Sequence, residues 1–378
     1  MGSAHLHCIA GGEIKGMSVS AVCDINGEKL KSAKAEFPRL SVYNDWRALL
    51  ADSGVDAVVI AVPHPLHAEI GIAAFESGRH VLVEKPEDIS VSAAGRLNKA
   101  AVKSGKTFGI MFNQRTNGLY RRARNIVKGG ELGALKRSVW IITNWYRTQS
   151  YYDSGGWRAT WKGEGGGVLL NQAPHNLDLW QWICGMPVSV TAFCSVAKFH
   201  NIEVEDEASL YTTYADGSTG VFITSTGDYP GTNRLEISGT LGKLVIEDGV
   251  LKHWRLKEDE RRICNSSEES FCSINTEYNE YRCDSETAHR GILQNFANAV
   301  LNGEELLSPG IEGINELTIS NAAYLSEWSG NTSVGIPFDK EKFDRLLKDK
   351  IDSSAYDSGE NISEASSREY LPRWKVRW

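Results

Sequence analysis

Over the first third of the chain, short apolar segments alternate regularly with helical segments, and this alternation limits the possible folds more than any other feature. An unbroken apolar run such as 57–62 is typical of a strand that is buried on both faces. The expected strands are residues 17–24, 57–62, 80–84 and 107–112. The expected helices are residues 26–37, 66–77 and 90–104. This alternation predicts a parallel sheet with helices on both faces, and such sheets bind ligands beyond the carboxyl ends of their strands.

The middle of the chain has another pattern, in which short strands follow one another directly. Turn sequences such as Asp216-Gly217, Leu241-Gly242 and Asp248-Gly249 separate several of them. The strands are expected at residues 135–146, 188–199, 207–215, 220–225, 234–238 and 243–246. Helices are expected at residues 117–128, 171–184, 288–301 and 310–328. Consecutive strands of this kind favour a mostly antiparallel sheet against which helices pack.

These patterns define the expected fold class and domain organisation. We expect an α/β, Rossmann-type domain with a parallel sheet at residues 1–116. An α+β domain with a large, mostly antiparallel open sheet is expected at residues 117–340, for substrate binding and oligomerisation. Residues 341–378 are expected to be a C-terminal tail, because 352–367 are rich in Ser, Asp, Glu and Gly and resemble poorly ordered segments.

Composition excludes several classes of protein. The chain has 378 residues, 41 basic and 48 acidic, and a net charge of -7, so nothing in its charge favours nucleic acid or an anionic membrane. No apolar run approaches the ~18 residues that span a bilayer, and the start of the sequence lacks the pattern of a secretory signal. The seven cysteines show no CxxC spacing, which argues against a disulfide framework or a zinc site. A cytoplasmic protein is expected.

Asp24 ends the first expected strand, where dinucleotide-binding domains place the carboxylate that binds the adenosine ribose. A carboxylate there favours NAD and leaves NADP possible, although Asp24 could equally cap the helix at residue 26. Gly2 can correspond only to the last glycine of the G-x-G-x-x-G turn, and no strand precedes it. We therefore expect the sequence to begin about a dozen residues late for a complete fold. A misassigned start codon, a fragmentary gene or a real departure that weakens cofactor binding would each account for this.

Two segments carry the chemistry. The first is His80-Val-Leu-Val-Glu-Lys-Pro86, and the second runs from Gly165-Gly-Gly through Asn171-Gln-Ala-Pro-His175 to Asp178. Together, after a βαβ domain, they resemble the Gfo/Idh/MocA family of sugar oxidoreductases. Supporting matches are residues 61–67, 113–115, 154–158 and 292–296. The resemblance covers the chain from Gly2 to about residue 340.

The resemblance implies that NAD or NADP binds in the first domain, that a sugar or polyol lies on the second, and that a hydride passes between them. Lys85 would hydrogen-bond the reacting hydroxyl and stabilise alkoxide charge. His175 would be the general base. Asn171, where the family usually has Asp, cannot exchange a proton but can orient a sugar hydroxyl. We expect Asn171 and His175 to share a helix face, with Asp178 as a buried helix contact.

Other residues are assigned around these. The spacing of His64 and His67 does not suit a metal. The Pro63–His67 loop is expected to line the nicotinamide ribose. The expected cofactor-binding residues are Gly2, Asp24, Pro63, His64, His67, Glu84, Lys85, Asn113 and Arg115. The expected substrate-binding residues are Trp157, Arg158, Asn171 and His175. The aromatic residues near them that could stack on a pyranose, or simply pack, are Tyr146, Tyr151, Tyr152, Trp157 and Trp161.

Three functions agree with these residues. The leading hypothesis is an NAD(P)-dependent dehydrogenase of a sugar, sugar derivative or cyclitol. A second is redox-neutral glycoside cleavage, in which transient oxidation acidifies a neighbouring C–H, elimination breaks the glycosidic bond, and the cofactor returns the hydride. The third is a cofactor-impaired binding or regulatory protein. The resemblance also implies a homodimer or homotetramer.

Overall fold

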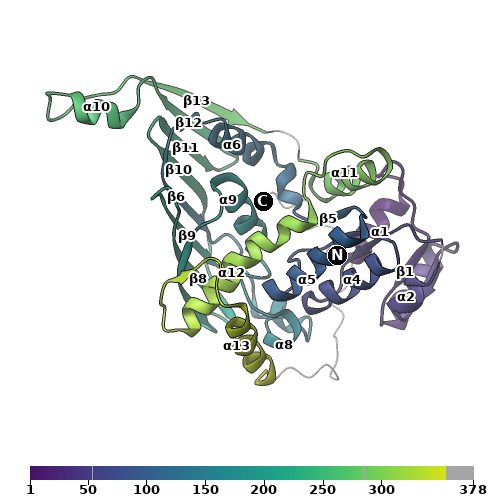
Figure 1. Ribbon diagram of the computed structural model, residues 1–378. Coiled ribbons are helices and arrows are strands. Elements are labelled where there is room, and N and C mark those ends of the chain that lie inside the picture. Colours follow the sequence, from purple (N-terminus) through teal and green to yellow (C-terminus); the bar gives the residue numbers. More distant parts are fainter. Residues whose placement is uncertain (53, 284–285, 355–378) are drawn as a thin grey trace. The chain divides into compact units, whose positions relative to one another are not determined.

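The protein divides into two compact units. The structure, a computed structural model, describes residues 1–52, 54–283 and 286–354 (Figure 1). Within this part of the chain, unit 1 consists of residues 1–113 and 287–314, and unit 2 consists of residues 114–286 and 315–354. Unit 1 is therefore built from two separate stretches of sequence.

The strands of unit 1 form parallel sheets, as the alternating pattern predicts. One sheet pairs β1 (Ala21–Cys23) with β2 (Ser41–Tyr43), and the other has the order β3 (Ala57–Ile60), β4 (His80–Val83) and β5 (Phe108–Ile110). A doubly wound sheet would place one more strand between the pair and the triplet. The described residues of unit 1 contain no strand at that position.

Helices cover the three-stranded sheet of unit 1 on both faces. Val81 and Val83 of β4 belong to the core formed with α4 (His67–Glu76) and α5 (Val91–Ser104). Leu82, which points to the opposite face, belongs to the core formed with α1 (Gly2–Ala10) and α11 (Ala288–Asn302). All three β4 side chains have no exposed area, which explains the unbroken apolar run. The remaining helices of this unit are α2 (Gly27–Glu36) and α3 (Trp46–Leu50), with the short turns η1 (His64–Leu66), η2 (Asn113–Thr116, at the boundary) and η3 (Gly310–Glu312).

Local signals explain where these helices begin and end. The Asn26 side chain accepts hydrogen bonds from the N–H groups of Glu28 and Lys29, so Asn26 is the N-cap of α2. Ser90 caps α5 in the same way, and Gly105, at φ +65°, ends it. Asp24 is therefore not the cap of the first predicted helix.

Unit 2 is built on a nine-stranded sheet in the order β13-β12-β11-β10-β6-β9-β8-β7-β14. All neighbours are antiparallel except β6 and β9. The strands are β6 (Leu135–Ile142), β7 (Ser189–Val196), β8 (Glu205–Thr213), β9 (Thr219–Ser225), β10 (Asn233–Gly239), β11 (Gly242–Glu247), β12 (Val250–Leu256), β13 (Thr276–Arg282) and β14 (Val334–Gly335). The mostly antiparallel sheet is confirmed, whereas β12, β13 and β14 were not expected.

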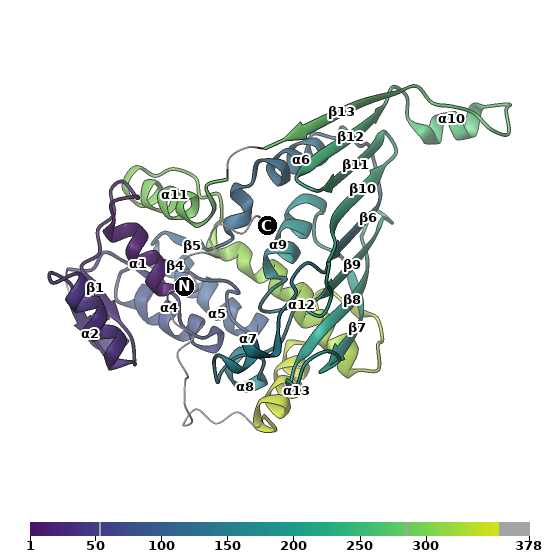
Figure 2. The same ribbon diagram turned by 180° about the vertical axis from the view of Figure 1, so that it is seen from behind.

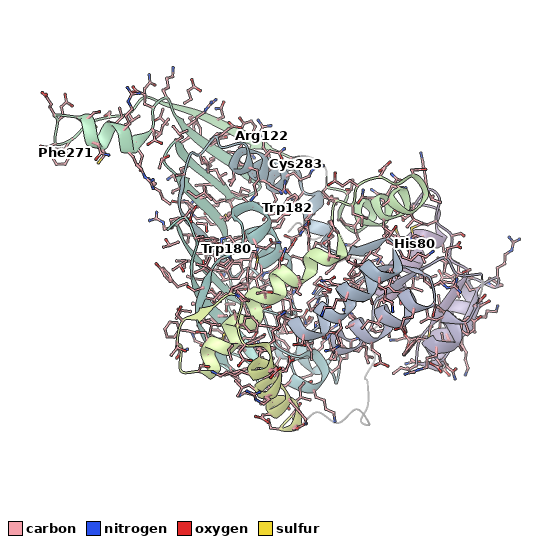
Figure 3. All side chains as sticks on the ribbon, viewed as in Figure 1. His80, Arg122, Trp180, Trp182, Phe271 and Cys283 are labelled. Carbon is pink, nitrogen blue, oxygen red and sulfur yellow. The ribbon has the colours of Figure 1, made fainter. Side chains whose placement is uncertain are left out.

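Figures 1 and 2 show α6 (Gly118–Lys128), α9 (Pro174–Cys184) and α12 (Gly313–Trp328) on one face of this sheet. Trp180 of α9 is fully buried there, 5.4 Å from the Phe222 ring, and its indole N–H donates to Ser138 (Figure 3). Phe193 and Tyr211 alternate with buried residues of β7 and β8 and are 62% and 49% exposed, so they lie on the opposite face. The sheet thus has one packed and one open face.

Unit 2 also contains four helices that were not predicted from the sequence. These are α7 (Gln149–Asp153), α8 (Trp161–Glu164), α10 (Glu260–Ser266) and α13 (Lys340–Asp352). A tail was expected from residue 341, but α13 is an ordered helix whose Phe343 is buried and stacks on Trp328. Of the predicted poorly ordered segment, residues 355–367 lie outside the described part of the chain. None of the helices in the described residues is long and apolar enough to cross a membrane.

Candidate functional site

The carboxyl ends of β3, β4 and β5 bring several predicted residues of unit 1 to one sheet edge. Parallel strands end at the same edge, and Pro63, Lys85 and Asn113 each follow one of these strands. Lys85 is partly buried, and the peptide bond that joins it to Pro86 is cis. The structure therefore groups these three residues where a parallel sheet binds its ligands.

Glu84, directly before Lys85, is held from inside the unit. Its carboxylate accepts a hydrogen bond from His5 Nε2 at 2.7 Å, and both side chains are almost fully buried. Burial alone would raise the pKa of Glu84, but the hydrogen bond and charge of His5 outweigh it and hold the pKa well below its ordinary value. The second carboxylate oxygen lies 3.3 Å from the backbone N of Lys85. Glu84 thus fixes the start of the segment that contains Lys85.

Two histidines beside Glu84 were missed by the sequence analysis. His5 lies on α1 and His289 on α11, and their ring centroids are 5.9 Å apart. His289 Nδ1 lies 3.3 Å from Asn113 Nδ2. Burial lowers the pKa of His289 to about 4, so this ring is neutral near pH 7. Nothing in the sequence pattern indicated these contacts, which join residues far apart in the chain.

His67 requires a correction. It was assigned to the cofactor, but its side chain has no exposed area. One ring nitrogen lies 2.7 Å from the carbonyl oxygen of Pro86 and the other 2.9 Å from that of Val62. A side chain engaged in this way cannot touch a ligand. His67 instead ties the loop after β3 to the segment after Lys85. His64 is also buried, with 6% of its surface exposed, and its ring lies 5.8 Å from the His67 ring.

Asp24 and Gly2 are the residues of unit 1 expected to hold the nucleotide. One Asp24 oxygen accepts a hydrogen bond from the Asn26 N–H, and the other lies 3.8 Å from Lys29 Nζ. The Asp24 side chain is 38% exposed, so it can accept ribose hydroxyls. Gly2 begins α1, and a Cβ added there would lie 3.7 Å from Ala61, just beyond β3. A helix N-terminus at a strand end suits a phosphate. The residues present therefore fit a dinucleotide.

In unit 2, the Gly165–Gly167 segment forms a turn that Glu205 holds. The carboxylate of Glu205 accepts hydrogen bonds from the N–H groups of Gly167 and Leu169 and from the Tyr324 hydroxyl at 2.7 Å. Burial raises the pKa of Glu205 to about 7, against the opposing effect of these hydrogen bonds. A Cβ at Gly167 would lie 1.9 Å from the Glu205 carbonyl oxygen, so only glycine fits.

Asn171 lies in this turn rather than on the predicted helix, because α9 begins at Pro174. The prediction that Asn171 and His175 share a helix face is therefore wrong. The Asn171 amide donates to Glu164 and, at 3.4 Å, to the Tyr151 hydroxyl. Glu164 is 1% exposed and also accepts the Ala159 N–H at 2.6 Å. The amide that replaces the family's usual Asp is thus anchored by a buried carboxylate.

His175 and Asp178 lie in the first part of α9. His175 is partly buried in the first turn of the helix. Asp178 is fully buried and receives two hydrogen bonds from Arg115, 2.8 Å from Nε and 2.6 Å from Nη2. Asp178 is therefore the buried contact that was expected. Arg115 has no exposed area, so its assignment to the cofactor is corrected to a structural role: its guanidinium neutralises a buried carboxylate.

The aromatic residues predicted near the substrate divide into two groups. Tyr152 and Trp161 are buried, and they contact Thr226 and Tyr324 respectively, so they belong to the core. Tyr146 is 45% exposed. Tyr151 and Trp157 are partly exposed, and the Arg158 guanidinium lies 4.7 and 4.8 Å from their ring centroids.

Comparisons with known proteins agree with this arrangement. A family model described as an oxidoreductase family with an NAD-binding Rossmann fold matches residues 2–112, and the GFO/IDH/MocA C-terminal domain matches residues 120–245. The chain is 25% identical over 309 residues to scyllo-inositol 2-dehydrogenase (NAD(+)) of Bacillus subtilis, covering 79% of this chain and 84% of that protein. It is 32% identical over 135 residues to inositol 2-dehydrogenase of Salmonella paratyphi B, covering 35% and 40%.

A solved structure extends the likeness over most of the chain. The WlbA dehydrogenase of Bordetella pertussis, in complex with NADH and UDP-GlcNAcA, has a TM-score of 0.75 with 24% identity, covering 89% of this chain and 96% of that one. The parallel sheets of unit 1 and the large sheet of unit 2, with the match to an oxidoreductase family, make this a two-domain, NAD-binding oxidoreductase. The chain belongs to the Gfo/Idh/MocA family.

Proposed function

We propose that this protein is an NAD-dependent dehydrogenase that oxidises a CH–OH group of a sugar, sugar derivative or cyclitol. The observation that carries the proposal is the place of Lys85, just beyond a strand whose last three residues are fully buried, with its backbone N–H held by the Glu84 carboxylate. The similarity to scyllo-inositol 2-dehydrogenase and inositol 2-dehydrogenase supports the substrate class.

Each residue has one task in this proposal. The Lys85 ammonium donates a hydrogen bond to the reacting hydroxyl oxygen and stabilises its developing negative charge. The His175 imidazole takes the hydroxyl proton. Asp24 binds the adenosine ribose, and Trp157 offers an apolar face to the sugar ring. When bound, NAD accepts the hydride that the carbinol carbon loses.

The test is a set of initial rates of NADH formation with inositols and hexoses, using NAD and NADP in turn. The variants Lys85→Met and His175→Ala should lower kcat at least about 100-fold with an intact fold, because each removes a group needed in the transition state. Lys103→Met, which changes an exposed lysine on α5, is the matched control. Near-normal rates in Lys85→Met would place the chemistry elsewhere.

The same purified protein can be used to distinguish the two other candidate functions from the dehydrogenase. Release of free sugar from glycosides in the presence of NAD, without net NADH, would replace the simple dehydrogenase by redox-neutral cleavage. The parallel strands of unit 1 form two separate sheets, which is the reason to test whether the protein binds the cofactor at all. If titration of NADH fluorescence shows no binding, a binding or regulatory protein becomes the better description.

The proposal also includes the cellular location and the oligomeric state of the protein. A cytoplasmic homodimer or homotetramer would place the open sheet face, with exposed Phe193 and Tyr211, between subunits. Light scattering of Phe193→Asp should then show a smaller mass than the unchanged protein.

A further inference from the structure

Glu84 is a buried carboxylate to which the proposed chemistry gives no task. Its side chain lies at the end of β4, directly before Lys85. Burying a carboxylate is costly unless a hydrogen-bond donor or a positive charge meets it. One oxygen accepts a hydrogen bond from His5 Nε2 at 2.7 Å, and the other lies 3.3 Å from the backbone N of Lys85. The Glu84 carboxylate therefore connects His5, on α1, to the residue that is proposed to act on the substrate.

Three neighbouring groups oppose the effect of burial on Glu84. Burial raises the pKa of its carboxyl, whereas His5 from α1, His289 from α11 and Lys85 beyond β4 lower it. Of the three, His5 contributes most, through its hydrogen bond and its charge. His289 is neutral near pH 7, and so is His67 on α4, because burial lowers the pKa of both rings. His5 therefore decides whether this buried carboxylate stays ionised.

The backbone of Lys85 is held on both sides. The Glu84 carboxylate holds it before the lysine, and His67 Nδ1, 2.7 Å from the carbonyl oxygen of Pro86, holds it after the lysine. A misplacement of about 1 Å in a reacting group can cost about 100-fold in rate, so these contacts matter for a residue that must meet one substrate oxygen. Because α1 also begins at Gly2, where the nucleotide phosphate is expected, one helix supports both the cofactor and the lysine.

We infer that His5 is a positioning residue for Lys85: through the Glu84 carboxylate it fixes the backbone from which the lysine side chain extends. The inference rests on the proposed dehydrogenase function, in which Lys85 acts on the substrate. Without His5, the effect of burial on Glu84 is no longer opposed by its main counterweight, and the carboxylate takes up a proton at higher pH. A protonated carboxyl accepts a weaker hydrogen bond than a carboxylate, so the Lys85 N–H is held less firmly.

The kinetic experiment measures kcat and KM for NAD in His5→Leu, Glu84→Gln and the variant that combines both. Each single change should lower kcat at least about tenfold, because a hydrogen bond to a charged group is lost, and should leave KM for NAD within about threefold. The combined variant should be no slower than the slower single variant, because both changes act on one contact. His5→Gln keeps an N–H donor and should be at least about threefold faster than His5→Leu. The matched control is His7→Leu, which removes an exposed His–Glu pair from the same helix and should leave kcat unchanged.

The pH dependence of kcat separates positioning from a general disturbance of α1. In the unchanged protein, Glu84 stays ionised above about pH 5, so other groups determine the acid side of the profile. In His5→Leu, the acid side should move at least about one pH unit higher, because Glu84 now takes up a proton there. Glu84→Gln has no carboxyl to titrate at this position and should not show that shift.

Labelling of lysines with acetic anhydride requires no turnover, so it separates failure of this inference from failure of the proposed function. Mass spectrometry compares the acetylation of Lys85 with that of exposed Lys103 in the same sample. Acetylation of Lys85 should rise at least about threefold in His5→Leu and in Glu84→Gln, because the lysine loses its fixed backbone and a nearby carboxylate, and should not rise in His7→Leu. That result without oxidation of any sugar would support the inference and contradict the dehydrogenase. Unchanged acetylation of Lys85 in His5→Leu, or additive losses of kcat in the combined variant, would overturn the inference.

Discussion

The turn around Gly167 provides a demanding test of the structure. In Gly167→Ala, the new Cβ would meet the Glu205 carbonyl oxygen at 1.9 Å and the Val204 side chain at 2.9 Å. Because the nearest atom belongs to the backbone, the turn itself must move. That movement breaks the hydrogen bonds that the Glu205 carboxylate accepts from Gly167 N, 3.0 Å away, and Leu169 N, 2.9 Å away.

The magnitude follows from these two effects. Overpacking a buried site costs about 1–3 kcal/mol, and losing a hydrogen bond to a charged group costs about 1.5–3 kcal/mol. For one overpacked contact and two lost hydrogen bonds these figures total about 4–9 kcal/mol, so we expect the free energy of unfolding of unit 2 to fall by at least about 4 kcal/mol. The same shift displaces Asn171, four residues further on, so kcat should fall even in conditions where the variant is folded.

Urea unfolding followed by tryptophan fluorescence measures this change, because Trp46 is the only described tryptophan outside unit 2. The matched control is Gly95→Ala, in α5, where an added Cβ has no neighbour within 4 Å. Alanine there should be neutral or stabilising by up to about 1 kcal/mol. A Gly167→Ala protein within about 1 kcal/mol of the unchanged one would refute the account of the turn.

Three other perturbations test separate parts of the molecule. The pKa of His289 is about 4 in the folded protein and 6.5 in the unfolded protein, so the unfolded state binds more protons between these pH values. The free energy of unfolding should therefore fall, by at most about 3 kcal/mol, as the pH drops from 6.5 to 4. Urea denaturation of His289→Asn should not show that loss, whereas the control His7→Asn, at an exposed histidine, should show it. Asp178→Asn removes the carboxylate that pairs with the buried Arg115 guanidinium and should lower the free energy of unfolding by about 3–5 kcal/mol in urea titrations. A cost below about 1 kcal/mol would contradict the ion pair. Asp24→Ser should lower kcat/KM for NAD about tenfold, because the ribose hydroxyls lose a charged acceptor. It should raise kcat/KM for NADP, because the 2′-phosphate no longer meets a carboxylate of like charge. An unchanged ratio of kcat/KM for NAD to kcat/KM for NADP would show that Asp24 is not part of the nucleotide site.

Strands and helices whose apolar residues mark a buried face could be predicted from the sequence. β3, β4 and β5 were expected because apolar runs mark strands buried on both faces. β13 was missed because all but one of its residues are exposed, so it carries no apolar alternation. α1 was missed because its first residues were considered only as the end of a glycine-rich turn. A strand at the exposed edge of a sheet has few buried apolar residues, so hydrophobic periodicity does not identify it in the sequence.

Candidate site residues that follow a strand could be predicted from the sequence, whereas contacts between residues far apart in the chain could not. Asp24 and Lys85 were expected at strand ends, and the structure has them there. The contacts of Glu84 with His5, of Arg115 with Asp178 and of Glu205 with the glycine turn were not expected. Each joins residues at least 36 positions apart, and no local periodicity specifies such a pair.

The return of α11 to unit 1 has a consequence for how the molecule can be divided. Ile292 and Phe296 complete the core against Leu82 and Met111, so residues 114–286 of unit 2 are inserted between the two stretches of unit 1, and residues 315–354 belong to unit 2 again. A single cut therefore releases neither unit whole: a fragment that stops at residue 113 would leave one face of the strand that carries Lys85 open to water. Separate expression of unit 1 requires a short linker that joins residue 113 directly to residue 287 and a chain that stops at residue 314.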